Sequence, residues 1–182
     1  TDVKEYANIR KNGKIAIALA EGDELISVEY TTGNSDIMVA SNEGKVIRFN
    51  ESDCRPLSRD TMGVKAIDLT DDDYLVDMLV LRPKTLILTV TEKGYGKLSP
   101  QSEYRCQTRR GKGTKAGVFN SKTGRLVGLK QITPEDDVML ISNHGIVLRT
   151  PANTISVIGR DTLGVKVLKL REDDQVVCLA VA

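Results

Sequence analysis

The sequence is short of several residue types on which common folds and sites depend. It contains no tryptophan and one histidine, and aromatic residues make up 4% of its 182 positions. No apolar run approaches the ~20 residues that a membrane-spanning helix needs, and the opening TDVKEYANIRKNGK is too polar for a secretory signal. The formal net charge is +1, so only the distribution of charge can reveal a charged partner. We therefore expect a cytoplasmic protein without a membrane partner.

The cysteines and the histidine form no recognisable reactive or metal-binding pattern. Cys54, Cys106 and Cys178 are 52 and 72 residues apart, which suits neither a C-x-x-C metal site nor a disulfide framework. We expect three free thiols. His144 stands beside Gly145 at an expected hairpin corner, so we interpret it as a turn residue. The sequence predicts no catalytic residue and no metal site.

Internal repetition is the clearest feature that the sequence does have. The segment DTMGVKAIDL (60–69) returns as DTLGVKVLKL (161–170), and the motifs around Gly44, Gly94 and Gly145 align with one another. The offsets between copies are 50 and 51 residues. A sustained period of this size is typical of a propeller or a solenoid built from equivalent units.

Each repeat holds four segments with strand character. In the first full copy they are ELISVEY (24–30), DIMVAS (36–41), KVIRF (45–49) and VKAIDL (64–69), and a long connecting stretch (50–63) precedes the last. No window shows a helical period, and four short strands per unit are typical of a propeller blade. The sequence therefore predicts an all-β, propeller-like array of four-stranded blades. We place repeat boundaries near residues 13, 63, 117 and 164, and expect a single domain of about four blades that belongs to a longer array.

Acidic and basic side chains recur at different places in the repeat. Acidic groups precede the first strand at 21–24, 71–73 and 172–174, whereas the third copy has SKTGR (121–125) there. Basic groups follow the corner glycine or lie in and just after the connecting stretch. We expect them to form a belt, separate from the acidic turns, that binds a polyanion; its members are Arg10, Lys14, Lys45, Arg48, Arg59, Lys65, Lys97, Arg105, Arg109, Arg110, Lys112, Lys115, Arg149, Arg160 and Lys166.

The residue types around this belt favour duplex DNA held by its backbone. The few aromatic residues disfavour a platform that stacks single-stranded bases, and no predicted helix could read a major groove. Glycines beside arginines in RRGKG (109–113) would let the main chain approach phosphates. A propeller scaffold that binds a protein partner through aromatic and arginine anchors remains the alternative of another class.

The motifs GDELISV, EGKVIRF, TEKGYGK, GIVLRT and ISVIGRDTLGV, in this order along the whole chain, resemble the later blades of the C-terminal domain of the DNA gyrase A subunit. The family's signature heptad is Q-R-R-G-G-K-G. The nearest stretch here is QTRRGKG (107–113), in which Gln107, Arg109, Gly111, Lys112 and Gly113 match, while Thr108 and Arg110 depart from the pattern. We interpret it as a degenerate copy of this box.

The resemblance implies a β-pinwheel, a six-bladed propeller relative that exchanges strands between blades. It implies a domain without chemistry or cofactor of its own, which wraps double-stranded DNA so that a bacterial type IIA topoisomerase introduces negative supercoils. The catalytic tyrosine, the ATPase, the ATP and the Mg²⁺ would then belong to the B subunit or to the rest of the A subunit, in the nucleoid-containing cytoplasm. The related domain of the topoisomerase IV A subunit is the competing identity.

Overall fold

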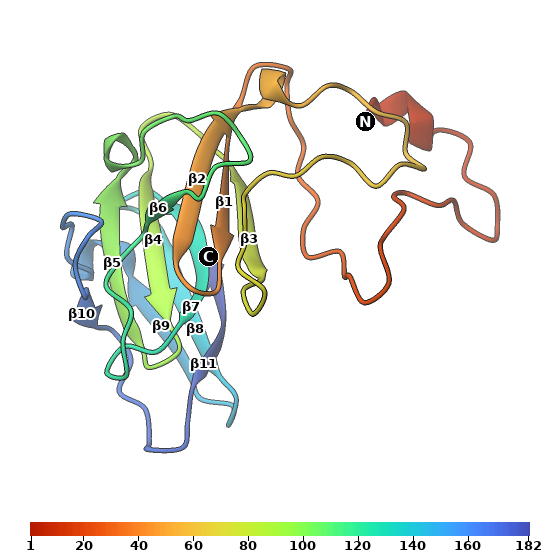
Figure 1. The fold of residues 1–182 in the computed structure, drawn as a ribbon. Coiled ribbons are helices and arrows are strands. Elements are labelled where there is room, and N and C mark those ends of the chain that lie inside the picture. The colour runs from red at the N-terminus through yellow and green to blue at the C-terminus, as the bar shows by residue number, and fades with distance from the viewer.

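The computed structural model describes residues 1–182 and consists of three antiparallel sheets packed face to face (Figure 1). The strand order is β3-β1-β2-β6 in the first sheet, β10-β5-β4-β7 in the middle sheet and β11-β8-β9 in the last sheet. The strands are β1 (Asp36–Ser41), β2 (Lys45–Asn50), β3 (Leu75–Val80), β4 (Leu86–Thr91), β5 (Tyr95–Pro100), β6 (Thr114–Lys115), β7 (Leu126–Ile132), β8 (Asp137–Ser142), β9 (Val147–Pro151), β10 (Val165–Lys166) and β11 (Val176–Val181).

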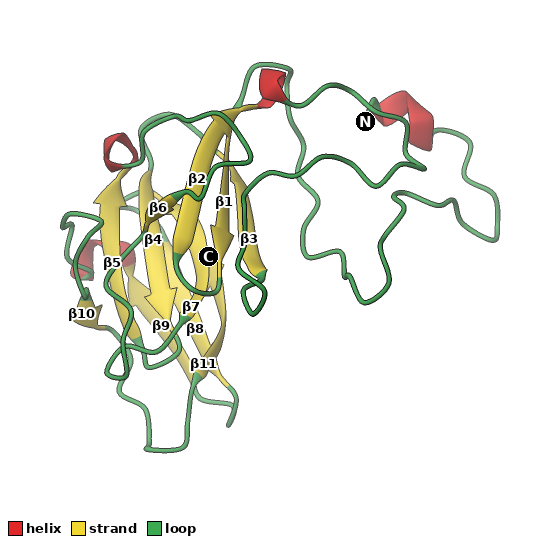
Figure 2. Ribbon diagram, in the orientation of Figure 1, coloured by secondary structure: helices red, strands yellow, loops and turns green.

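Helical structure is limited to four short 3₁₀ segments, shown in red in Figure 2. They are η1 (Val3–Tyr6), η2 (Glu51–Asp53), η3 (Gln101–Glu103) and η4 (Ala152–Thr154). The last three occupy equivalent places, directly after the second strand of each hairpin. No helix has the length and apolar character that crossing a membrane would require.

A central hairpin forms each sheet, as the repeat predicted. The hairpins β1–β2, β4–β5 and β8–β9 turn at corners that contain Gly44, Gly94 and Gly145, whose φ angles are 81°, 74° and 79°. This left-handed backbone is strained for a residue with a Cβ atom. The glycine signal therefore located all three corners correctly.

The remaining strands of each sheet come from the next repeat. Strand β3 pairs with β1 and the two-residue strand β6 pairs with β2; in the same way β7 pairs with β4 and β10 pairs with β5. Neighbouring repeats thus exchange strands, and a propeller-like unit is complete only when two successive repeats contribute to it. The expected all-β array with a repeat of about 50 residues is confirmed.

Two predicted strands, 24–30 and 64–69, are not strands in the structure. Their counterpart β3 pairs with residues 34 to 43 positions upstream, and their counterpart β6 pairs with residues 68 to 70 positions upstream. The same offsets counted back from 24–30 and from 64–65, the positions equivalent to β6, fall before Thr1. Without a complete partner strand, strand propensity alone does not form a strand; segment 64–69 keeps only isolated hydrogen bonds, such as Asp68 N–H to Gly111 O over 2.9 Å. Residues 1–35 accordingly extend outward from the first sheet without strand structure (Figure 1).

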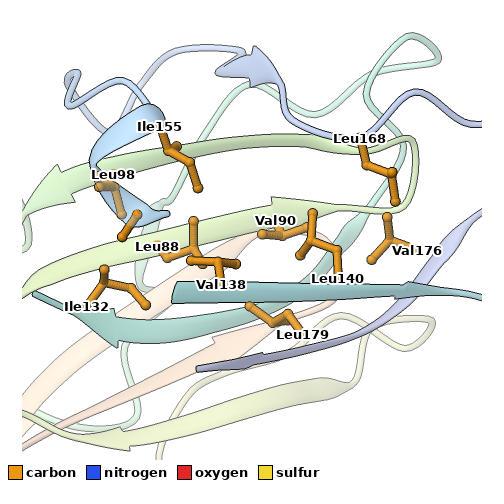
Figure 3. Close-up of a cluster of buried hydrophobic side chains, with 11 residues drawn as sticks. Leu88, Val90, Leu98, Ile132, Val138, Leu140, Ile155, Leu168, Val176 and Leu179 are labelled. Carbon is orange, nitrogen blue, oxygen red and sulfur yellow. The ribbon is translucent and has the colours of Figure 1, made fainter. Parts of the chain in front are cut away.

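The hydrophobic core forms three clusters, two between the sheets and one on the outer face of the first sheet. The largest contains 11 buried residues and joins the middle and last sheets; Leu88, Leu98 and Val138 are among them (Figure 3). Alternation along β1 places Met38 in the cluster between the first and middle sheets and Val39 in the cluster on the outer face. Because both faces of the inner strands are buried, the sheets form a rigid stack that positions the connecting stretches.

Candidate nucleic-acid interface

Main-chain hydrogen bonds hold the connecting stretch 100–113 against the first sheet. The N–H of Gln107 donates to the carbonyl of Arg48 over 2.7 Å, and the N–H of Arg110 donates to the carbonyl of Ala66 over 2.6 Å. Strand β6 follows and continues the pairing with β2. The stretch that holds the densest basic cluster is therefore a fixed part of the sheet edge.

Three arginines at equivalent repeat positions bind main-chain carbonyls. Arg109 donates through Nε to Asp53 O over 2.8 Å and through Nη1 to Lys65 O over 3.0 Å. Arg160 repeats this geometry one unit later, with Glu103 O at 3.0 Å and Lys115 O at 2.7 Å, and Arg59 Nη1 lies 2.7 Å from Ile15 O. These guanidinium groups connect successive connecting stretches, so much of their hydrogen-bonding capacity is used within the fold.

Two predicted contacts are corrected by their burial and their partners. Lys97 is 2% exposed, and its ammonium group donates to the carbonyls of Gly159, Arg160 and Thr162. Burial lowers the pKa of Lys97 to about 8. Arg48 forms an ion pair with Asp36 at 2.6 Å. The Lys97 ammonium cannot reach a surface ligand, and Arg48 is largely committed to the fold.

The partners of Arg48 include the neighbouring stretch as well as Asp36. Its Nη1 donates to the carbonyls of Gln101 and Tyr104 over 3.2 and 3.3 Å. Hydrogen bonds and the nearby guanidinium charge of Arg48 lower the pKa of Asp36 against the opposing effect of burial, which is the largest single influence. The pair Arg149–Asp137, at 2.7 Å, is the equivalent on the last sheet, where the arginine side chain is 63% exposed.

Other predicted side chains form no hydrogen bond or ion pair through their charged groups, and all of them except the half-buried Lys45 are exposed. Lys45 and Lys115 lie directly opposite each other on β2 and β6. Like charges in this arrangement repel, and an anion between them would offset that cost. With the two lysines, this free basic set comprises Arg10, Arg105, Arg110 and Lys112.

The remaining predicted basic side chains are exposed but already have partners. Lys14 Nζ donates to the carbonyls of Glu5 and Ala7 over 2.9 Å. Lys166 Nζ donates to Lys93 O over 3.0 Å. Lys65 pairs with the exposed carboxylate of Asp68 at 2.6 Å. A pair of this kind contributes little in water, so Lys65 remains available to another anion.

Asp68 is a third carboxylate inside the basic belt, besides the partners of Arg48 and Arg149. A hydrogen bond and the charge of Lys65 lower the pKa of Asp68, and Lys112 and Arg110 act in the same direction. The acidic turns lie elsewhere: Asp73 Oδ1 accepts the N–H of Glu43 at the corner of the first sheet. The expected separation of acidic and basic groups therefore has exceptions at Asp36, Asp68 and Asp137.

The box-like residues Gln107, Gly111 and Gly113 have different environments. Gln107 Nε2 is buried without a hydrogen-bond partner. Gly113 has φ +66°, and a Cβ there would lie 2.7 Å from the carbonyl oxygen of Val46, whereas a Cβ at Gly111 would meet nothing closer than 3.6 Å. The packing of the main chain on β2 thus explains the glycine at 113. Residues 105–111 line a shallow hollow on this surface.

The exchanged strands and the corner-glycine hairpins define the chain as a strand-swapped relative of the β-propellers, with basic residues on its connecting stretches. The sequence profile described as "DNA gyrase C-terminal domain, beta-propeller" matches residues 1–32, 35–82, 85–133 and 136–181. These four matches cover nearly the whole chain. The chain therefore belongs to the DNA gyrase A C-terminal domain family, whose fold is the β-pinwheel.

Curated relatives agree with this assignment. The DNA gyrase A protein of Ureaplasma parvum serovar 3 is 40% identical over 180 residues, which are 99% of this chain and 21% of the relative. The DNA gyrase A protein of Staphylococcus epidermidis is 42% identical over 172 residues, which are 93% of this chain and 19% of the relative. The chain thus spans about a fifth of the length of these relatives.

Two solved structures share the fold. A structure of the DNA gyrase A C-terminal domain superposes with a TM-score of 0.86 and 30% identity, over 94% of this chain and 58% of that one. The C-terminal domain of DNA topoisomerase IV superposes with a TM-score of 0.93 at 22% identity, over 99% of this chain and 57% of that one. At that identity the second likeness concerns the fold alone.

Proposed function

We propose that the chain binds duplex DNA through phosphate contacts on its connecting stretches and wraps it without reading base sequence. The observation that carries the proposal is the part of the free basic set that lies at the edge of the first sheet: Arg110, Lys112 and Lys115 are exposed and unpaired, on a main chain that is already fixed. Neutralising a phosphate releases condensed counterions, and such contacts position a duplex without specifying bases.

The larger role follows from family membership. We infer that the wrapped duplex serves the negative supercoiling of a bacterial gyrase. The catalytic tyrosine, the ATP and the Mg²⁺ would lie in the B subunit or in the rest of the A subunit, so the chain itself would act as an accessory domain and not as an enzyme. Its partners would be double-stranded DNA and these two polypeptide parts, in the cytoplasm.

The test removes two charges from the proposed interface and two from a control turn. Arg110 has φ 71° and Lys84, on the turn between β3 and β4, has φ 60°; asparagine tolerates this backbone. The test variant is R110N/K112A and the matched control is R82A/K84N. Arg82 and Lys84 are exposed. The two variants therefore have equal net charge and comparable backbone demands.

Affinity for two duplexes of unrelated sequence is measured between 50 and 200 mM salt. The slope of log affinity against log salt should flatten in the test variant by up to about 0.9 for each phosphate contact that the substitutions remove. The flattening should be equal on both duplexes, and the slope should change little in the control. A fall in affinity for only one duplex, or equal slopes for the two variants, would refute phosphate contacts at Arg110 and Lys112. A protein-binding scaffold would give the second result.

A further inference from the structure

The corner of the middle sheet has the opposite charge to the corner of the first sheet. Lys93 occupies the position of Glu43, directly before the corner glycine, and Lys122 occupies the position of Asp71 in the turn from the next repeat. In the first corner the Glu43 carboxylate accepts a hydrogen bond of 3.5 Å from Thr70. The same scaffold position therefore carries acids in one blade and lysines in the next.

Three lysines from three chain segments meet at the middle corner. Lys166 Nζ donates to Lys93 O over 3.0 Å, and Lys93 Nζ donates to Ser121 O over 2.6 Å. The ammonium groups of Lys166 and Lys122 lie 4.7 and 5.8 Å from the centre of the Tyr95 ring. We call Lys93, Lys122 and Lys166 the lysine corner; all three side chains are exposed.

The cations of the lysine corner are partly ordered and outnumber the one carboxylate beside them, that of Glu92, whose Oε2 accepts the N–H of Arg125 over 2.8 Å. Carbonyl oxygens and the face of an aromatic ring attract ammonium groups, yet none of the three lysines forms an ion pair. Three like charges on one corner repel one another. A ligand that brings negative charge would remove this repulsion, and the partial ordering reduces the entropy cost of binding.

The position of the corner favours a duplex over an acidic polypeptide. Lys166 lies on β10, opposite Tyr95 of β5, just as Lys115 lies on β6 opposite Lys45. The lysine corner is thus the middle-sheet counterpart of the free lysine pair on the first sheet, and it extends that surface onto the turn. Tyr95 is half-buried, so the corner presents little of the aromatic or apolar anchor that a protein partner would use.

We propose that the lysine corner is a second phosphate-contacting surface, on which the duplex passes from the connecting stretches onto the corner of the middle sheet. The inference rests on the proposed function. It assigns roles in DNA binding to Lys93 and Lys122, which lie outside the connecting stretches. It also implies that the turn edge of the middle sheet binds DNA, unlike the acidic turn edges beside it.

The experiment compares K93Q/K122Q with the control R82A/K84N and with R110N/K112A, in salt titrations of duplex binding by the 182-residue chain. The single variant K122Q is measured as well, because the ammonium group of Lys122 forms no hydrogen bond and its removal leaves the fold intact. We expect K93Q/K122Q to make up to two fewer phosphate contacts than the wild type. Its affinity at 50 mM salt would then be lower than that of the wild type. The ratio of wild-type to variant affinity would be roughly 10-fold smaller at 200 mM salt than at 50 mM salt.

Each result separates the inference from the proposed function. A flatter slope in K93Q/K122Q and in K122Q, but not in the control, supports the lysine corner. If only R110N/K112A flattens the slope, the proposed function stands and the lysine corner is overturned. If no variant does, both are overturned. If K93Q/K122Q binds duplex normally but no longer binds a polyglutamate peptide, the corner serves an acidic polypeptide and the inference is wrong.

Discussion

The connecting stretches 100–113 and 151–164 follow the same path on successive sheets but carry different charges. In both, a main-chain N–H binds the preceding hairpin: Gln107 donates to Arg48 O over 2.7 Å, and Ile158 donates to Leu98 O over 2.9 Å. Arg109 and Arg160 both bind carbonyls of the neighbouring stretches. The positions that hold the main chain are thus alike in the two copies.

The exposed positions of the two stretches differ. Arg105, Arg110 and Lys112 in the first copy correspond to Ser156, Asp161 and Leu163 in the second. These side chains lie away from the hydrogen bonds that fix the main chain, so their identity is free to vary without altering the scaffold. The same backbone path therefore accommodates different numbers of charged side chains. The role of a basic residue in this array, in the fold or in binding, depends on its hydrogen-bond partners as well as on its repeat position.

Replacing the glycine that ends either stretch should have the largest effect. Gly113 and Gly164 have φ +66° and +80°, and a Cβ would lie 2.7 Å from Val46 O and 2.8 Å from Gly96 O. We expect G113A and G164A each to lower the free energy of unfolding by about 2–4 kcal/mol, from strain and from displacement of a sheet carbonyl. Thermal or denaturant unfolding measures this. G111A is the control, and we expect it to change the free energy of unfolding by less than about 1 kcal/mol. Equal effects of all three substitutions would contradict the conclusion that Gly113 and Gly164 have the same structural role in the two stretches.

The residue that packs beneath each stretch differs between the two copies, and this difference should make stability depend on pH. Ile47 lies under the first, whereas Lys97, with its pKa lowered to about 8, lies under the second. A lysine of depressed pKa binds fewer protons when folded than when unfolded between about pH 8 and its ordinary value of 10.5. Its contribution to stability is therefore least favourable below pH 8 and improves as the pH rises to 10.5.

We expect the stability of the wild type relative to K97M to increase by on the order of 2–3 kcal/mol from pH 7.5 to pH 10.5. Denaturant unfolding of both proteins across this range measures the difference, in which the titration of the other groups cancels. Parallel stability curves would show that burial does not lower the pKa of the Lys97 ammonium group in the folded protein.

The arginines that bind carbonyls should affect stability more than DNA binding. R109A and R160A each remove two hydrogen bonds from a charged donor, and we expect each to lower the free energy of unfolding by about 1–2 kcal/mol. Because these guanidinium groups are engaged within the protein, the salt slope of duplex binding should stay close to the wild-type value. R110N should do the reverse, with little change in stability and a flatter slope. A flatter slope in R109A would place that arginine among the phosphate contacts.

The smallest effect on stability is expected from introducing into stretch 151–164 a lysine at the position that Lys112 occupies in stretch 100–113. Leu163 is 37% exposed and occupies the position of Lys112. L163K should change the free energy of unfolding by less than about 0.5 kcal/mol and steepen the salt slope by up to about 0.9. L163Q is the uncharged control. An unchanged slope in L163K would show that the duplex does not reach the second stretch.

The amino-acid sequence by itself determined the repeat, the all-β class and the hairpin corners. A 50-residue period and a glycine at each corner are local signals, because a left-handed backbone restricts the residue type wherever it occurs. The short apolar segments 36–41 and 45–49 likewise indicated strands. The sequence also contained the charge reversal at Lys93 and Lys122. Compared with the acidic turns of the other repeats, however, this turn was interpreted only as one that lacks acidic residues.

Only the tertiary structure decided which strands form and which basic residues are free. Segments 24–30 and 64–69 have the composition of strands, yet a strand needs a partner, and the exchange between repeats places that partner in the preceding unit. Lys97, Arg109 and Lys112 look alike in the sequence, but the first is buried on carbonyls, the second connects two stretches and the third is exposed without a partner. Hydrogen bonds between residues about 45 to 65 positions apart make these distinctions, and a local pattern does not encode contacts at that distance.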